Sequence, residues 1–150
     1  MRVHLGCDHA GFELKEHFLG WLREHGHDPV DHGPSVYNDH DDYPAYCIAA
    51  ASAVMRDPGS LGVVIGGSGN GEAIAANKVI GVRAALAWSV ETARLGRLHN
   101  DANVLSIGAR MHTEQEATGF LAEFLGTAFS AEARHVRRID QLHRFEQERG

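Results

Sequence analysis

The stretch GGSGNGE at residues 66–72 places one carboxylate, Glu72, at the end of a glycine-rich loop. Glycine lets backbone N–H groups approach a ligand closely, and a loop that enters a helix adds the positive end of the helix dipole. Such a loop suits a phosphate group or a developing oxyanion. A tight strand-to-helix turn capped by Ser68 or Asn70 would explain the same residues, so the loop alone leaves both interpretations open.

Glu72 itself has two interpretations. A carboxylate in the first turn of a helix can simply stabilise the helix dipole. A carboxylate beside an anion-stabilising pocket can also act as the general base that removes a proton next to a carbonyl group. Burial would raise the pKa of Glu72 and the helix dipole would lower it, and the sequence does not decide between them. The glycine spacing matches neither a phosphate loop ending in GK[ST] nor a complete GxGxxG, which disfavours a nucleotide as ligand.

Two histidine-containing pairs are further candidates for chemistry. Asp8-His9 follows an apolar stretch near the N-terminus, and His99-Asn100 follows a segment with helical spacing. A histidine can give or take a proton at a sugar oxygen near neutral pH. The alternatives are structural: Asp8 could cap a helix beside an exposed His9, and Asn100 could end a helix in the left-handed conformation.

Several arginines and one tyrosine are candidate substrate ligands. Arg134 and Arg138 are four residues apart, so they share one face of a helix, and Arg110 follows a predicted strand. In a chain with a net charge of −6, the local cluster ARHVRR could bind a phosphate, although solvent exposure would explain it equally well. Tyr43, which precedes Pro44 at a predicted helix start, could hydrogen-bond in the same site.

The elements that must position these residues alternate between strand and helix along the chain. Strands are predicted at residues 2–7, 28–32, 61–65, 82–87 and 103–107, and helices at 12–26, 43–55, 73–78, 90–99, 113–125 and 130–148. This alternation indicates parallel strands joined by right-handed crossovers, with helices covering the sheet. Ligands of such sheets bind at the carboxyl ends of the strands, so the residues that follow strands should share one rim.

Composition limits the class of protein. The 150 residues suggest one domain, and 43% hydrophobic residues suffice for a sizeable core. The negative net charge, with no basic block, argues against nucleic acid or an anionic membrane as partner. The 11 histidines show no zinc-site spacing, and no segment reaches the length of a membrane helix. Two cysteines, Cys7 and Cys47, suggest no disulfide framework, so we expect a reducing, cytoplasmic location.

Five segments together resemble one known family over essentially the whole chain. In order, these segments are GCDHAGFELK, DYP, GGSGNGEAIAANK, RLHNDANVLSIGAR and ARHVRRID. They resemble type B ribose-5-phosphate isomerases, whose family includes the subunits of galactose-6-phosphate isomerase. The resemblance implies interconversion of ribose 5-phosphate and ribulose 5-phosphate on a Rossmann-like three-layer αβα sandwich with a five-stranded parallel sheet. It also implies no metal or organic cofactor, and a homodimer with sites at the subunit interface; a tetramer is left open.

The resemblance also implies roles for individual residues. The catalytic residues would be Glu72, His99, Ser68 and Asp8, with His99 and Asp8 assisting ring opening. The substrate-binding residues would be His9, Tyr43, Gly67, Gly69, Asn70, Gly71, Asn100, Arg110, Arg134 and Arg138. Among these, the glycine-rich loop would stabilise the enediolate, and Arg110, Arg134 and Arg138 would bind the phosphate.

One position departs from the commoner family pattern. Many members carry a cysteine base where this chain has Gly66, and a second branch that reads GGSGNGE uses a glutamate instead. The resemblance to that branch implies that Glu72 removes the C2 proton and returns it to C1. Two alternatives remain: an isomerase of allose 6-phosphate or galactose 6-phosphate, or a non-catalytic phosphosugar-binding module, which would not need both Glu72 and His99.

Overall fold

The computed structural model describes residues 1–150, and its five strands form one parallel sheet with the order β2-β1-β3-β5-β4. The strands are β1 (Arg2–Cys7), β2 (Asp28–Asp31), β3 (Leu61–Gly66), β4 (Ala84–Leu86) and β5 (Val104–Gly108). The connections from β1 and β3 leave in opposite directions, so the carboxyl ends of these two strands are the switch point of the sheet. We call the space between the loops that follow these two strands the crevice. The predicted five-stranded parallel sheet is therefore confirmed.

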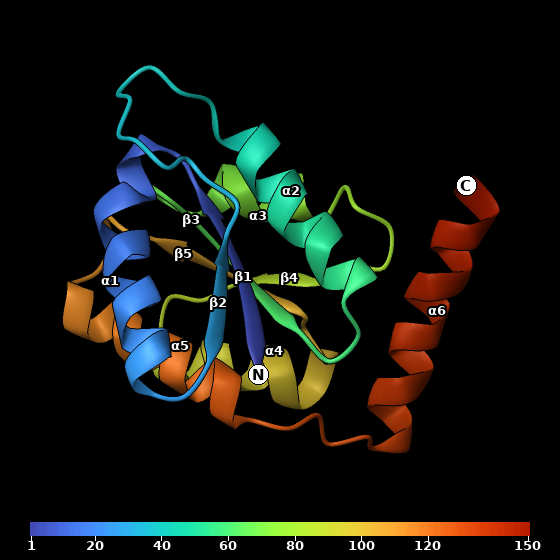
Figure 1. The fold of residues 1–150 in the computed structure, drawn as a ribbon. Helices are drawn as coiled ribbons and strands as arrows, with labels where there is room; N and C mark the ends of the chain where they lie inside the picture. Colours follow the sequence, from blue (N-terminus) through green and yellow to red (C-terminus); the bar gives the residue numbers. More distant parts are fainter.

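Helices cover both faces of this sheet, as Figure 1 shows. The covering helices are α1 (Phe12–Glu24), α2 (Tyr43–Arg56), α3 (Asn70–Ala76), α4 (Val90–Asn100) and α5 (Glu114–Gly126). The chain also forms a 3-10 turn, η1 (His9–Gly11), and a C-terminal helix, α6 (Ala133–Arg149). One apolar cluster joins the sheet to α1, α4 and α5, and a second joins it to α2 and α3. These two clusters confirm the three-layer sandwich. No helix combines the length and apolar character needed to cross a membrane.

The structure moves some predicted boundaries. Helix α3 begins at Asn70 rather than residue 73, because Gly69 adopts a left-handed conformation (φ 83°) that directs the chain into the helix. Glu72 consequently lies in the first turn of α3. Strand β4 is shorter than predicted because it is an edge strand that pairs only with β5. The C-terminal helix expected at residues 130–148 is α6.

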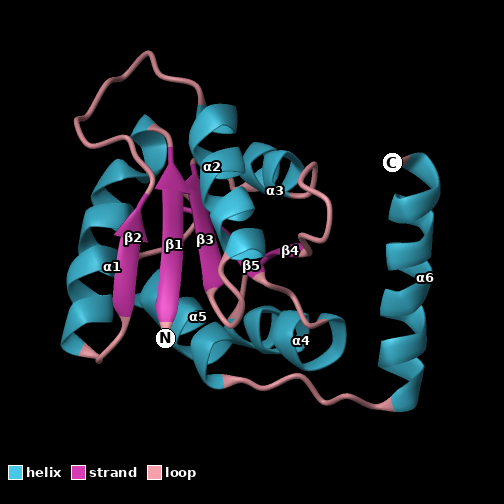
Figure 2. Cartoon of the chain, turned by 45° about the vertical axis from the view of Figure 1, so that its right-hand side comes forward, coloured by secondary structure: helices cyan, strands magenta, loops and turns pink.

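Helix α6 stands apart from the rest of the molecule (Figure 2). It is attached where the His135 ring stacks on His99, with ring centroids 4.4 Å apart, where His143 Nε2 lies 2.9 Å from Arg83 Nη1, and where the Glu146 carboxylate accepts from the Gly81 N–H. Between these contacts it leaves large apolar side chains exposed, namely Val136, Leu142 and Phe145. A charged helix with an uncovered apolar stripe is typical of a protein–protein interface.

A buried lysine fixes the long loop between β2 and α2. The Lys15 side chain on α1 has no solvent exposure, and its ammonium donates to both carboxylate oxygens of Asp31, at 2.9 and 3.0 Å, and to the carbonyl oxygen of Pro34. The Cys7 N–H, at the end of β1, donates to the Gly33 carbonyl oxygen at 3.2 Å. These contacts hold the start of the loop beside the carboxyl end of β1.

We expect Lys15→Met to destabilise the protein by about 2–3 kcal/mol, because it leaves the Asp31 carboxylate and the Pro34 carbonyl without their buried donor. The measurement is urea unfolding followed by circular dichroism. Lys78→Met, at an exposed lysine, is the matched control. Equal unfolding midpoints for the two variants would contradict a stabilising role for this contact.

Candidate active site

Asp8 and His9 follow β1 directly and form one side of the crevice between β1 and β3. Asp8 is 8% exposed, and its Oδ1 accepts a hydrogen bond from the Ala10 N–H at 2.9 Å. Asp8 therefore caps η1, as the structural interpretation held, but Oδ1 alone makes this bond. Its other oxygen, Oδ2, has no protein partner and can serve a ligand.

The glycine-rich loop forms the other side of the crevice. A Cβ on Gly69 would lie 2.7 Å from Leu86 Cδ1 and 2.9 Å from the Ile107 carbonyl carbon, so this position requires glycine for space as well as for its positive φ. The Ser106 hydroxyl donates to the Gly69 carbonyl oxygen at 2.7 Å and fixes the loop from below. Ser68 is exposed at the tip, where its hydroxyl accepts only a long bond, 3.3 Å, from the Asn70 N–H.

Glu72 points back from α3 to the end of β3. Its carboxylate lies so close to the Gly66 Cα that a Cβ at Gly66 would overlap Oε1, Cδ and Oε2 of the glutamate. The residue is 4% exposed. Glycine at position 66 is therefore what makes room for the carboxylate. The Glu72 carboxylate occupies the space that a side chain at position 66 would enter, which is where the family resemblance puts a cysteine in other members.

Burial raises the pKa of Glu72, and this effect outweighs the backbone N–H groups of Glu72 and Gly69, which lower it. The negative charge of Asp8 raises the pKa of Glu72 further. A carboxylate with a raised pKa is a stronger base at neutral pH than an exposed one. Burial and the helix dipole have opposite effects on the pKa of Glu72, and in this structure the effect of burial is the larger.

Both cysteines are buried free thiols. Burial raises the pKa of Cys7 to about 12 and raises the pKa of Cys47 further. Neither thiol forms a thiolate at neutral pH, so neither can act as the nucleophile or base. The thiols are therefore poor candidates for the base whose role the family resemblance gives to Glu72.

Tyr43 and Arg110 lie beside the same loop. The Tyr43 ring, from the first residue of α2, lies against Gly71 so closely that a Cβ there would overlap its Cζ and hydroxyl. Arg110 follows β5, and its Nη1 lies 3.4 Å from the Cβ position of Gly67. The crevice at the strand ends thus brings together most of the predicted site residues, namely Asp8, His9, Tyr43, Gly67, Ser68, Gly69, Asn70, Gly71, Glu72 and Arg110.

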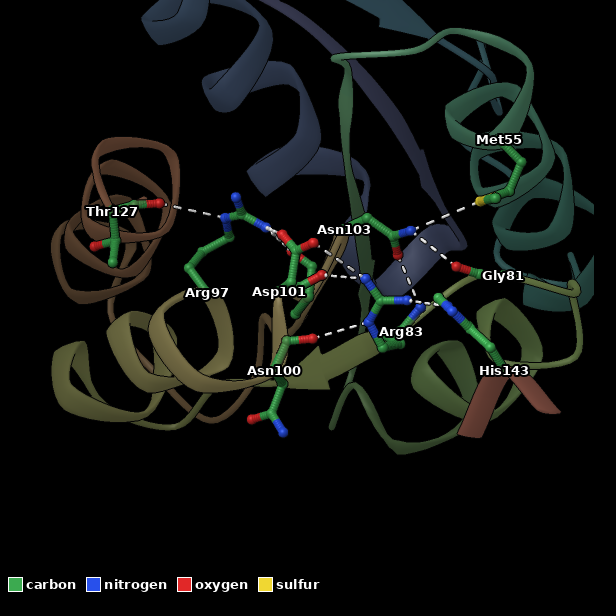
Figure 3. A network of polar contacts seen from close by, with 10 residues as sticks. Met55, Gly81, Arg83, Arg97, Asn100, Asp101, Asn103, Thr127 and His143 are labelled. Atoms are coloured by element: carbon green, nitrogen blue, oxygen red, sulfur yellow. Dashed lines mark hydrogen bonds and ion pairs between the residues drawn. The ribbon is translucent and has the colours of Figure 1, made fainter. Parts of the chain in front are cut away.

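His99 and Asn100 lie at the opposite end of the sheet from the crevice, beside the amino ends of the strands. Arg83, directly before β4, donates from Nε to the Asn100 carbonyl oxygen at 2.8 Å and from Nη2 to the Asp101 carbonyl oxygen at 2.9 Å (Figure 3). These bonds fix the end of α4 at the amino ends of β4 and β5, because α4 runs antiparallel to the strands. The left-handed residue that ends α4 is Asp101 (φ 45°), so the alternative interpretation of Asn100 as a left-handed helix end is wrong.

Arg134 and Arg138 lie on the same side of the molecule as His99 and Asn100, away from the crevice. Both are exposed on α6, on either side of the His135 that stacks on His99. Arg134 contacts only the exposed carboxylate of Glu132, at 3.0 Å. A single chain therefore does not bring His99, Asn100, Arg134 and Arg138 to the crevice that holds Glu72.

The sequence interpretation missed Asp41, which contacts His9 from the loop before α2. Asp41 Oδ1 accepts from both the His9 N–H and the His9 ring Nδ1, each at 2.8 Å. The sequence contains the acidic run DHDD before Tyr43, but nothing in the spacing of this run connects Asp41 to His9, 32 positions earlier. Asp8, His9 and Asp41 are also the one group of three potential metal ligands, with one atom of each within 4.8 Å of the others. Within this group, His9 Nδ1 and Asp41 Oδ1 are already hydrogen-bonded to each other.

Comparison with known proteins identifies the family to which this fold and site belong. The chain matches the Ribose/Galactose Isomerase family over residues 3–142. It is 58% identical to ribose-5-phosphate isomerase B of Mycobacterium leprae, over 97% of this chain and 90% of the relative. It is 36% identical to ribose-5-phosphate isomerase B of Escherichia coli, over 99% of this chain and 98% of that one. The chain belongs to the ribose/galactose isomerase family.

Solved structures agree with this assignment. Ribose-5-phosphate isomerase B of Clostridium thermocellum superposes with a TM-score of 0.95 at 35% identity, covering 100% of both chains. Ribose-5-phosphate isomerase B of Mycoplasma genitalium, solved with bound ribulose-5-phosphate, gives 0.94 at 38% identity, covering 98% of this chain and 97% of that one. The likeness covers all layers of the fold, α6 included.

The raised pKa of Glu72 predicts a specific dependence of stability on pH. The folded protein holds this proton more tightly than the unfolded chain, so the stabilisation is present below the ordinary pKa of 4.5 and is lost as the pH rises through the folded value. Glu72→Gln should therefore be more stable than the wild type at pH 7, and its advantage should shrink towards pH ~4.5.

Urea unfolding of both proteins across this pH range is the measurement. Glu13→Gln, at an exposed glutamate, is the matched control. A stability difference between Glu72→Gln and wild type that is constant with pH would contradict a buried carboxylate with a raised pKa.

Proposed function

We propose that this protein interconverts D-ribose 5-phosphate and D-ribulose 5-phosphate through an enediolate, with Glu72 as the general base. The observation that carries this proposal is the buried Glu72 carboxylate, set against Gly66 at the mouth of a loop that offers backbone N–H donors. A carboxylate in that place is unfavourable for stability and has a chemical use in proton abstraction. The names of the relatives at 57–58% identity support the same substrate pair.

The proposed reaction uses the crevice residues together with His99, Arg134 and Arg138. The furanose ring opens with the help of Asp8 and His99. Glu72 then takes the proton from C2 and returns it to C1, while the loop N–H groups hold the enediolate oxygens as negative charge develops. The exposed hydroxyl of Ser68 carries the proton between O1 and O2. Arg110, Arg134 and Arg138 hold the phosphate, which fixes the open chain relative to Glu72.

A complete site requires two copies of the chain. His99, Asn100, Arg134 and Arg138 lie at the amino ends of the strands, away from Glu72, so a second copy must contribute them to the crevice. The exposed apolar side chains of α6 and its separation from the body support an interface there. We therefore propose a homodimer in which each site combines the crevice of one chain with these four residues of the other. Two buried free thiols suit a reducing cytoplasm.

The activity is tested by following ketose formation from ribose 5-phosphate in EDTA, beside allose 6-phosphate as a six-carbon substrate. We expect turnover of the five-carbon sugar, and Glu72→Gln should lower kcat by about 10²- to 10⁴-fold while binding is kept. Preference for allose 6-phosphate would assign a six-carbon substrate. Binding without turnover would indicate a phosphosugar-binding module, and near-normal kcat in Glu72→Gln would exclude this residue as the base.

The shared site predicts complementation between two inactive variants. When Glu72→Gln and His99→Asn chains are unfolded together and refolded, half of the dimers are mixed, and each mixed dimer has one intact site. We expect about a quarter of the wild-type specific activity from this statistical mixture. Glu72→Gln mixed with Ser68→Ala is the control, since both residues lie on the same rim and no intact site forms. No recovery in the first mixture would place His99 and Glu72 of one site in the same chain.

A further inference from the structure

Asp41 is a buried carboxylate whose side chain bonds to one residue only. Its Oδ1 accepts from the His9 backbone N–H and from the His9 ring Nδ1, both at 2.8 Å. The Asp41 side chain is 5% exposed, and its Oδ2 is buried without a hydrogen-bond partner. A buried carboxylate with an unsatisfied oxygen is costly, so its two bonds to His9 must account for its presence there.

These two bonds fix both the position and the tautomer of the His9 ring. Because Asp41 is an acceptor, Nδ1 must carry a proton, and the ring presents its Nε2 edge away from Asp41. The His9 side chain is 24% exposed, and Nε2 makes no hydrogen bond within the chain. Tyr37, from the same loop as Asp41, contacts the His9 ring edge-on, with centroids 6.4 Å apart. The loop thus holds His9 from two sides and leaves Nε2 free.

The charges around His9 come from three residues. Asp41 raises the pKa of His9 through its hydrogen bond, and Asp8 raises it through its charge, whereas burial and the charge of Arg110 lower it. The net effect is to raise the pKa of His9, which favours an imidazolium beside the Arg110 guanidinium. When the His9 ring is protonated, it and the Arg110 guanidinium are two cations at the same rim, which suits a ligand with a doubly charged group.

We propose that Asp41 is the positioning residue for His9, holding the ring by Nδ1 so that Nε2–H donates to an anionic oxygen of the bound sugar phosphate. This inference rests on the proposed function for the identity of the ligand. Lys15 contributes indirectly, because it fixes the start of the loop that carries Asp41. Lys15 holds the start of this loop and the Asp41–His9 contact holds its end. The loop therefore stays in place across the carboxyl end of β1.

The test is Asp41→Asn, which keeps the shape of the side chain and removes its charge. We expect KM for ribose 5-phosphate to rise about tenfold, with kcat within about twofold, since the loss falls on binding. The inhibition constant of inorganic phosphate should rise in parallel. The pH above which kcat/KM declines should move lower, because a neutral amide stabilises the imidazolium less. Asp42→Asn is the matched control, as Asp42 is the exposed neighbour and its side chain caps no N–H group.

A second measurement separates this inference from the proposed function. The His9 ring is titrated by NMR in wild type and in Asp41→Asn, with the His9 signal identified by its loss in His9→Gln. A lower pKa of His9 in Asp41→Asn supports the positioning role even if ribose 5-phosphate is not the substrate. An unchanged pKa and an unchanged KM would overturn it, and so would a collapse of kcat at constant KM, which would make His9 a proton-transfer group.

Discussion

Coverage of a parallel sheet on both faces is the constraint from which the rest of this structure follows. Every residue of β3 and of β5 is buried, so these strands offer no place for a charged side chain along their length. Charged and polar chemistry must therefore collect where the strands end. The neighbouring strands β1 and β3, whose connections leave in opposite directions, place the crevice at one such end. Asp8, the glycine-rich loop and Arg110 reach it simply because each follows a strand.

Glu72 is the exception to that rule, since it comes from a helix and is buried rather than exposed at the rim. Two features make this burial tolerable. Gly66 leaves the space that the carboxylate occupies, and the N–H groups of Gly69 and Glu72 interact favourably with its charge. They do not cancel the cost of burial, and the raised pKa of Glu72 is the measure of what remains. Stability is thus lost at neutral pH at the residue for which we propose the role of general base, a common relation between stability and activity.

The sequence predicted the sheet, its helices and the strand-end residues, because local periodicity and the rule for parallel sheets determine them together. Two parts of the site could not be predicted this way. The Asp41–His9 contact joins residues 32 positions apart through an irregular loop, whose course depends on Lys15 and Asp31 rather than on any periodic pattern. The position of His99 depends on the direction of α4, which brings the end of that helix to the amino side of the sheet, where Arg83 fixes it. A shared active site therefore could be inferred from the family resemblance but not from the spacing of these residues.

The geometry at Gly66 also bears on the two sequence patterns that the family resemblance implies, one with a cysteine at position 66 and one with a glutamate at position 72. A side chain at position 66 projects from the end of β3 into the same space that the Glu72 carboxylate fills from α3. The two cannot be present together, because the first atom of a side chain at 66 would overlap the carboxylate. With Glu72 in this conformation, position 66 must be glycine. In this chain a residue of α3, Glu72, places a carboxylate at the end of β3, and burial raises its pKa. A cysteine at position 66 would instead place a thiol there from β3 itself.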